Sequence, residues 1–327
     1  MRPTLLILTL LPTLATAEPI PEAPLGDWSL NIASGEAGWL SIAENAGTPA
    51  VAMFVDVGST RPKKSVEVRD GKIHIPLKTV RKNGRTGPVI RQTKAHVWSD
   101  SGTLKGEILT TFPAGDRKTI RDPFTASAIP PMPPAPDLSK VSYAKPLTLF
   151  NSTDLTGWSL RRPEKLNGWS VKNSLLTNET PKTDFSATGA YANLRTDATF
   201  GDGKLHIEFL IGKNRNSGVY VKGTYEAQVV DRDSPMQGIQ GVGAVFGRIP
   251  PSKNAGHEGG QWQTYDITLV DRHITVVLNG ERVIDNQPVR GPTPGAIHTD
   301  PMTPGPLYLQ GDHTSVQYRN IVFTPAK

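Results

Sequence analysis

Residues 216–231 read NSGVYVKGTYEAQVVD and have the pattern of a β-hairpin. One set of alternate positions is apolar: Val219, Val221, Tyr225, Ala227 and Val229. The other set carries Tyr220, Lys222, Glu226 and Gln228. Because successive side chains of a strand point to opposite faces, we expect the apolar set to face a core and the polar set to face outward.

The same alternation continues on both sides of this hairpin. In residues 204–211, KLHIEFLI, the apolar side chains share one face, and His206 and Glu208 share the other. Further strands are predicted in four segments: 265–270, 273–278, 306–311 and 316–323. Since no convincing helix of ten or more residues interrupts them, this part of the chain predicts a double-sheet antiparallel sandwich.

A second β-rich region precedes the sandwich. Turn signals such as Asp70-Gly71 and Asn83-Gly84 separate its strand-like runs, which are residues 27–32, 38–42, 50–55, 72–76, 95–98 and 104–109. We therefore predict a small all-β domain over residues 18–127, folded as a barrel or a sandwich. It shows no catalytic constellation, which favours a spacer or a binding module.

Residues 128–146, AIPPMPPAPDLSKVSYAKP, contain six prolines and separate the two regions. Such a run is stiff and extended, so we expect a linker that does not pack. The sandwich domain then covers residues 147–327.

The chain begins with the features of a secretory signal, predicted over residues 1–17. Arg2 is followed by an apolar stretch, and Ala15-Thr16-Ala17 fits a cleavage site. No second apolar stretch approaches the roughly 18–20 residues that span a bilayer. We expect an exported protein, periplasmic or secreted, that has no transmembrane anchor.

Composition excludes several classes of function. The 327 residues include no cysteine, which rules out disulfides, thiolate metal sites and cysteine nucleophiles. The formal net charge of +6 is scattered and forms no stripe with stacking aromatics, so we expect no nucleic-acid partner. Asp231 and Asp233 could contribute to a calcium site, but two carboxylates are too few to predict one.

The polar hairpin face suits a carbohydrate. Sugars need amides and carboxylates for their hydroxyls and an aromatic ring for their apolar face. The predicted outward set supplies all three: His206, Glu208, Tyr220, Lys222, Glu226, Gln228 and Gln310. Asp312-His313 follows Gln310 at the end of a strand, where His313 could act as a general base.

Other familiar catalytic patterns are absent from the sequence. We find no G-x-S-x-G elbow, no Walker-type phosphate loop and no dinucleotide fingerprint. The E-x-D-x-x-E run that marks retaining sandwich glycosidases is also missing.

Six blocks in residues 147–325 resemble the 3-keto-disaccharide hydrolase family. In order they are LFNSTDLTGWSL, NGWSVKNSLL, the strand with Glu208 followed by NSGVYVKGTYEAQVVD, GAVFGRIPPSKNAG, GGQWQTYDITLVDRHITVVLNGERV and GPLYLQGDHTSVQYRNI. The resemblance implies a concanavalin- or laminin-G-like double-sheet sandwich. It also implies cleavage of glucosides already oxidised at C3, through removal of the C2 proton, elimination at C1 and hydration.

The resemblance also implies a set of site residues. The family's recurrent polar positions fall on Glu208, Asn216, Glu226, Asp231, Gln310 and His313. We expect His313 or Glu226 to be the base and Lys222, where the family often has arginine, to stabilise the enolate oxygen. Substrate contacts are expected from Glu208, Asn216, Tyr220, Gln228, Asp231 and Gln310.

Three interpretations remain open from the sequence. The first is this enzyme, supplied with 3-keto-glucosides by a sugar 3-oxidoreductase. The second is a non-catalytic, lectin-like carbohydrate-binding module, and the third is a structural envelope protein. No cofactor is certain, although a divalent metal could take the place of Lys222 as the electrophile.

Overall fold

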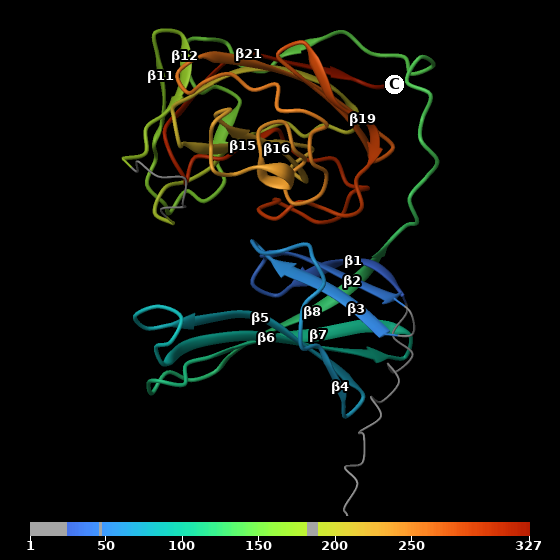
Figure 1. Cartoon of the computed structure of the whole chain (residues 1–327). Coiled ribbons are helices and arrows are strands. Elements are labelled where there is room, and N and C mark those ends of the chain that lie inside the picture. Colours follow the sequence, from blue (N-terminus) through green and yellow to red (C-terminus); the bar gives the residue numbers. More distant parts are fainter. Residues whose placement is uncertain (1–24, 46–47, 182–188) are drawn as a thin grey trace, which may run out of the picture.

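The computed structural model describes residues 25–45, 48–181 and 189–327. The predicted signal, residues 1–17, lies outside these residues. Within the described ranges, no helix has the length and apolarity needed to cross a bilayer. The chain forms two β-rich domains joined by a long extended segment (Figure 1).

The N-terminal domain is one curled antiparallel sheet with the strand order β3-β2-β1-β8-β7-β6-β5-β4. Its strands are β1 (Gly26–Ile32), β2 (Ala37–Asn45), β3 (Thr48–Val55), β4 (Glu67–Arg69), β5 (Lys72–Arg81), β6 (Val89–Asp100), β7 (Thr103–Thr111) and β8 (Ile120–Ile129). Apolar residues such as Leu40, Met53 and Ile75 fill the inside of the curl. This sheet contains all six predicted strands and adds β4 and β8.

The C-terminal domain is a sandwich of two antiparallel sheets. The five-stranded sheet has the order β10 (Trp158–Leu160), β13 (Leu194–Thr196), β20 (Tyr308–Leu309), β15 (Asn216–Val221) and β16 (Tyr225–Val230). The facing sheet has the order β11 (Trp169–Lys172), β12 (Leu175–Asn178), β21 (Val316–Pro325), β14 (Gly203–Ile211), β17 (Trp262–Val270), β18 (His273–Leu278) and β19 (Glu281–Pro288), with β9 (Leu147–Thr148) beside β21. These sheets confirm the predicted all-β fold and the double-sheet sandwich.

The core of the sandwich lies between its two sheets. The apolar faces of β14 and of the β15–β16 hairpin meet there, as their alternation predicts. Two polar contacts also join the sheets. The Ser217 hydroxyl lies 2.7 Å from that of Tyr318, and the Tyr265 hydroxyl donates to the Gln228 carbonyl at 2.5 Å. These contacts fix how the hairpin sits on the facing sheet.

The proline-rich segment packs, contrary to expectation. β8 already includes the first two of its predicted residues, Ala128 and Ile129. Beyond β8, the Arg272 guanidinium donates to the carbonyls of Pro130 and Pro131, and the Asn286 side-chain amide donates to that of Pro136. Proline carbonyls keep their full acceptor strength. The segment therefore runs up the side of the sandwich as a strap held by hydrogen bonds (Figure 1).

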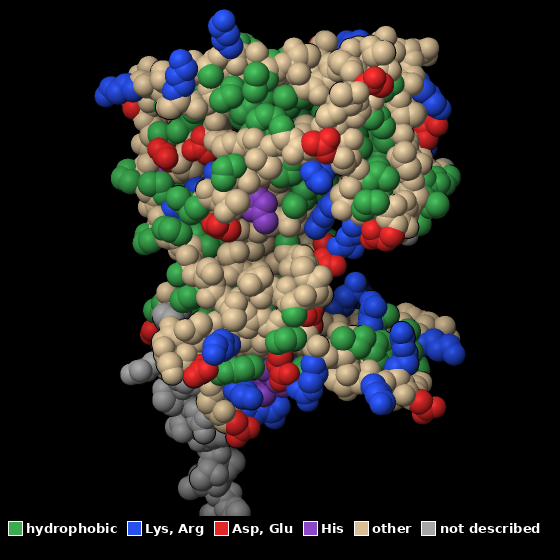
Figure 2. Space-filling model, turned by 180° about the vertical axis from the view of Figure 1, so that it is seen from behind, with side chains coloured by type: hydrophobic (Ala, Val, Ile, Leu, Met, Phe, Trp, Pro, Cys, Tyr) green, Lys and Arg blue, Asp and Glu red, His purple; other side chains and the backbone are tan. Residues whose placement is uncertain are grey.

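The two domains share an interface. Figure 1 shows β1, β2 and β3 below the part of the sandwich that contains β15 and β16. The buried Thr299 hydroxyl donates to the Gly38 carbonyl at 2.6 Å, and the Arg248 guanidinium lies 4.2 Å from the centre of the Trp39 ring. Seen from behind, the molecule narrows between the domains, and Lys and Arg side chains gather on both edges of a notch there (Figure 2).

Candidate functional site

A polar pocket of about 240 Å³ lies between the two domains. Its residues come from the loop after β3, the segment after β10, the residue before β13, the loop between β19 and β20, and β20 with its following loop. They are Asp56, Val57, Arg161, Arg162, Lys165, Asn193, Gly295, Tyr308, Gln310, Asp312 and His313. Two predicted site residues, Gln310 and His313, are thus in one pocket. The N-terminal domain supplies Asp56 and Val57.

His313 has a defined partner. Its Nδ1 lies 2.7 Å from Oδ1 of Asp312, and both side chains are four-fifths buried. Because a carboxylate only accepts hydrogen bonds, Nδ1 is the donor in this contact, and in the neutral imidazole the lone pair is then on Nε2. The backbone of Asp312 is itself held, since its N–H donates to Oδ1 of Asn193 at 3.0 Å. This arrangement suits a general base.

The Tyr308 hydroxyl is the centre of a second group. Arg161 donates to it from Nη1 at 3.1 Å, and Asn193 donates from Nδ2 at 2.5 Å. These two bonds use both lone pairs of the hydroxyl, and among the described residues its own proton has no acceptor. Burial raises the pKa of Tyr308 to about 12, so that proton is held at neutral pH.

Arg161 supplies fixed positive charge beside this hydroxyl. Its guanidinium also donates to the carbonyls of Gly295 and Ala296, at 3.1 and 3.2 Å, and lies 3.5 Å from the carboxylate of Asp56. Burial opposes its charge, but the neighbouring Tyr308 and Asp56 raise the pKa of Arg161 above its usual value. Arg161 therefore stays charged and immobile.

Glu226 lies next to the pocket but does not line it. Its side chain is 2% exposed, and Oε2 is 2.8 Å from the Tyr220 hydroxyl. The Tyr220 ring lies beside that of Tyr308, with 4.5 Å between the centroids. Burial raises the pKa of Glu226 to about 8. A neutral carboxylic acid that supports the pocket's aromatic wall fits these contacts better than a base that touches substrate.

The polar face of the hairpin is covered, which the alternation did not predict. Every residue of β15 and β16 is buried. The Gln228 side-chain amide donates to the carbonyl of Gln240 in a short 3₁₀ helix (Gly238–Gln240), and the Glu226 N–H donates to the hydroxyl of Thr293. Loops that return over the five-stranded sheet therefore replace solvent on this face.

The other predicted binding residues differ in their surroundings. The Oε1 atom of Gln310 is buried and has no hydrogen-bond partner among the described residues, so it can accept from a ligand hydroxyl. Asn216 and Asp231 lie at one end of the hairpin. Asn216 exchanges backbone hydrogen bonds with the Thr314 hydroxyl, and Asp231 accepts from the N–H of Asn214. Neither lines the pocket.

Glu208 and Lys222 are not brought to this pocket. Glu208 is on β14 of the facing sheet, where Arg319 and Asn320 donate to its carboxylate. The expectation of one shared polar face is therefore wrong for Glu208 and its neighbour His206, because the sandwich assigns β14 and β15 to different sheets. Lys222 occupies the β15–β16 turn, and its Nζ lies 3.3 Å from Oδ1 of Asp202.

Sequence reasoning missed several pocket residues. Arg161, Asn193 and Tyr308 line the pocket, yet none was singled out. Arg161 and Arg162 directly follow the family block LFNSTDLTGWSL, and this position could have pointed to Arg161. Asp56 is about a hundred residues before Arg161, in another domain, and no local pattern points to it.

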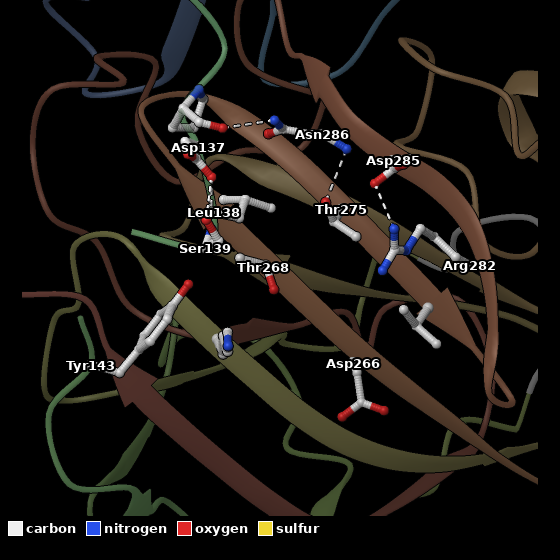
Figure 3. Close-up of a pocket in the computed structure, with 13 residues that line it drawn as sticks. Asp137, Leu138, Ser139, Tyr143, Asp266, Thr268, Thr275, Arg282, Asp285 and Asn286 are labelled. Atoms are coloured by element: carbon white, nitrogen blue, oxygen red, sulfur yellow. Dashed lines mark hydrogen bonds and ion pairs between the residues drawn. The ribbon is translucent and has the colours of Figure 1, made fainter. Parts of the chain in front are cut away.

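A larger pocket, of about 530 Å³, lies on the outer face of the eight-stranded C-terminal sheet. Figure 3 shows Asp137, Leu138, Ser139 and Tyr143 of the strap beside it. Its polar groups largely pair with one another, as Arg282 does with Asp285 at 3.2 Å. The described residues contain no cluster of three or more His, Asp or Glu side chains placed to bind a metal, here or elsewhere.

Comparison with protein families matches residues 145–324 to the 3-keto-alpha-glucoside-1,2-lyase-like domain. Two crystal structures of candidate glycosyl hydrolases from Parabacteroides distasonis ATCC 8503 are similar. One is 18% identical with a TM-score of 0.45, covering 56% of this chain and 94% of that chain. The other is 22% identical with a TM-score of 0.42, covering 56% and 100%. A search of curated proteins found no match.

Proposed function

The chain belongs to the family of 3-keto-alpha-glucoside-1,2-lyase-like domains, and on this premise we propose that it is a carbohydrate-active enzyme that cleaves glucosides oxidised at C3. The ketone acidifies the hydrogen on C2. A base removes that proton, and the resulting enolate expels the substituent on C1, which leaves as an alcohol once it is protonated. Water then adds across the C1–C2 double bond to give 3-keto-glucose, so the net reaction is hydrolysis.

His313 is the proposed base, and the contact between its Nδ1 and Asp312 is the observation that carries the proposal. This contact leaves Nε2 as the acceptor in a pocket large enough for about one sugar ring. Glu226, the other candidate from the sequence, is neutral at pH 7 and is bonded to Tyr220 outside the pocket. We assign it the support of the pocket wall.

Tyr308 and Arg161 are the proposed stabilisers of the enolate oxygen. Within the part of the chain that the structure describes, the Tyr308 hydroxyl has a proton without an acceptor. The Arg161 guanidinium, 3.1 Å from this hydroxyl, would favour negative charge on a substrate oxygen that accepts that proton. This pair replaces Lys222, whose ammonium group is engaged by Asp202 at the hairpin turn. Gln310 is placed to accept a hydrogen bond from a sugar hydroxyl.

The substrate class implies a partner and a location. A 3-keto-glucoside must come from an oxidation at C3, so we propose that a sugar 3-oxidoreductase supplies it. The signal-like segment at residues 1–17 supports export, and we propose that the protein acts outside the cytoplasm, in the periplasm or secreted.

Sugar release tests this function. Purified residues 18–327 would be incubated with a 3-keto-glucoside and with its unoxidised parent, with and without a chelator. We expect cleavage of the keto sugar alone, unaffected by the chelator and reduced by about 100-fold or more in His313→Ala.

Equal cleavage of the parent would overturn the elimination mechanism. Binding of the keto sugar without cleavage would instead make the protein a lectin-like module. Loss of activity with the chelator would assign the electrophile to a metal rather than to Tyr308 and Arg161.

A further inference from the structure

A second cavity in the N-terminal domain adjoins the candidate active site. It has a volume of about 530 Å³ and lies in the opening of the curled sheet, between the edge strand β3 and the strands β5 to β8. That volume is within the range of about 300–1,000 Å³ that is usual for ligand sites. Its apolar lining consists of Met53, Phe54, Val55, Val57, Leu77, Ile108 and Ile120.

The two cavities share residues. Asp56 and Val57, in the loop after β3, line both the polar pocket and this apolar one. The backbone of Asp56 is fixed in the left-handed region, with φ 56°. Its N–H donates to the Ala37 carbonyl at 2.7 Å, and its carbonyl accepts from the N–H of Gly295 at 2.6 Å. The boundary between the cavities is therefore a rigid part of the domain interface.

Two apolar side chains that line this cavity are exposed to solvent. Val57 is 62% exposed and Ile120 is 54% exposed, and both line the apolar cavity. A surface that keeps such residues open beside a hollow commonly marks a binding site. The neighbouring pocket is more polar, since charged and amide side chains dominate its lining. Together the two cavities fit a ligand with a polar end and an apolar end.

We propose that the N-terminal domain forms the aglycone subsite, so that the substrates are 3-keto-glucosides with an aromatic or alkyl aglycone. This inference rests on the proposed function, because it places the sugar against His313 and Gln310. The bond at C1 then crosses the boundary at Asp56 and Val57. The polar side chains at this cavity, which include Lys63, Thr110 and Asp122, stand beside a larger apolar lining that an aromatic ring or alkyl chain can cover and a second sugar cannot. The domain outside the family match thus contributes to specificity.

Selectivity among aglycones tests the proposal. The values of kcat/KM would be measured for the 3-keto derivatives of methyl, phenyl and octyl α-glucosides and of a glucose disaccharide. We expect the phenyl and octyl compounds to exceed the methyl compound by about tenfold or more, mostly through KM. Ile120→Asp, at an exposed position, should remove most of this preference for the phenyl and octyl compounds over the methyl compound. Ile90→Ser, at another exposed apolar position of the same sheet that lies outside the cavity, should leave it unchanged.

A binding measurement separates failure of the proposal from failure of the function. Calorimetric titration would compare phenyl and methyl α-glucoside with the wild-type protein and with Ile120→Asp. If keto sugars are cleaved without preference among aglycones, the subsite proposal is wrong and the function stands. If no keto sugar is cleaved, the function is wrong, and the subsite proposal survives only if the phenyl compound binds more tightly and Ile120→Asp removes that difference.

Discussion

The hydroxyl of Tyr220 lies 2.8 Å from Oε2 of Glu226 and 3.0 Å from the carbonyl oxygen of Pro294. A phenol has one proton, and a carbonyl can only accept. The single phenolic proton can therefore be donated to only one of these two acceptors at a time, the Glu226 carboxyl or the Pro294 carbonyl. Burial raises the pKa of Glu226 to about 8, although the hydrogen bond from Tyr220 works against this rise. The supporting wall of the pocket therefore contains a carboxyl that is harder to ionise than an exposed one.

Stability should fall with rising pH because of Glu226. Its carboxyl ionises near pH 4.5 in the unfolded chain and at about pH 8 in the folded one. The stability that the protonated Glu226 carboxyl contributes is fully present below pH 4.5, declines between pH 4.5 and about 8, and is lost above pH 8. At roughly 1.4 kcal/mol per pH unit, the loss is on the order of 5 kcal/mol.

Urea unfolding of the wild type and of Glu226→Gln between pH 5 and 9 measures this effect. The side-chain amide that this substitution introduces donates at every pH, so the variant should lose less stability over that interval. Parallel pH profiles for the two proteins would show that the carboxyl is not a buried neutral acid.

Asp312 should matter through His313. In Asp312→Asn the acceptor for Nδ1–H is weakened, so the tautomer with a free Nε2 is no longer favoured. We expect kcat on a 3-keto-glucoside to fall by about 10- to 100-fold, with KM little changed and the pH profile of kcat shifted. A variant that keeps the wild-type profile would remove His313 from the role of base.

Substitution of Arg161 should mainly lower kcat, whereas substitution of Lys222 should mainly lower the free energy of unfolding. Arg161→Met removes a donor to the Tyr308 hydroxyl, and we expect kcat to fall by about 100-fold. Lys222→Met breaks the pair with Asp202 and should lower the free energy of unfolding by about 1.5–3 kcal/mol. Steady-state kinetics and urea unfolding of both variants give the comparison, and a Lys222→Met enzyme that folds normally but does not turn over would restore Lys222 as the electrophile.

Gly218 should be needed for the carboxyl of Glu226 to fit. A Cβ at position 218 would lie 2.1 Å from Oε1 and 2.9 Å from Cδ of Glu226. Gly218→Ala should therefore destabilise the protein by about 1–3 kcal/mol. Gly115→Ala, in open space, is the matched control and should be nearly neutral. Equal midpoints for the two variants in thermal unfolding would contradict the close contact.

Local alternation predicted most of the long strands, but not β8, β19 or short strands of the sandwich such as β10 and β13. The side chains of KLHIEFLI do alternate between core and surface in β14, and the apolar set of the hairpin does face the core. Alternation reports only on which face a side chain occupies, however. It does not say to which sheet a strand belongs, so Glu208 and Glu226 looked equivalent from their sequence patterns.

Local patterns in the sequence were enough to predict most of the long strands, the family and two pocket residues, Gln310 and His313, because each is encoded within a few neighbouring positions. The folded chain was needed to show that Arg161 and Asn193 meet at Tyr308, that Glu226 is buried, and that Asp56 from the other domain joins the pocket. These contacts join residues far apart along the chain. They depend on the order of strands and on the docking of two domains, which no local period of the sequence specifies.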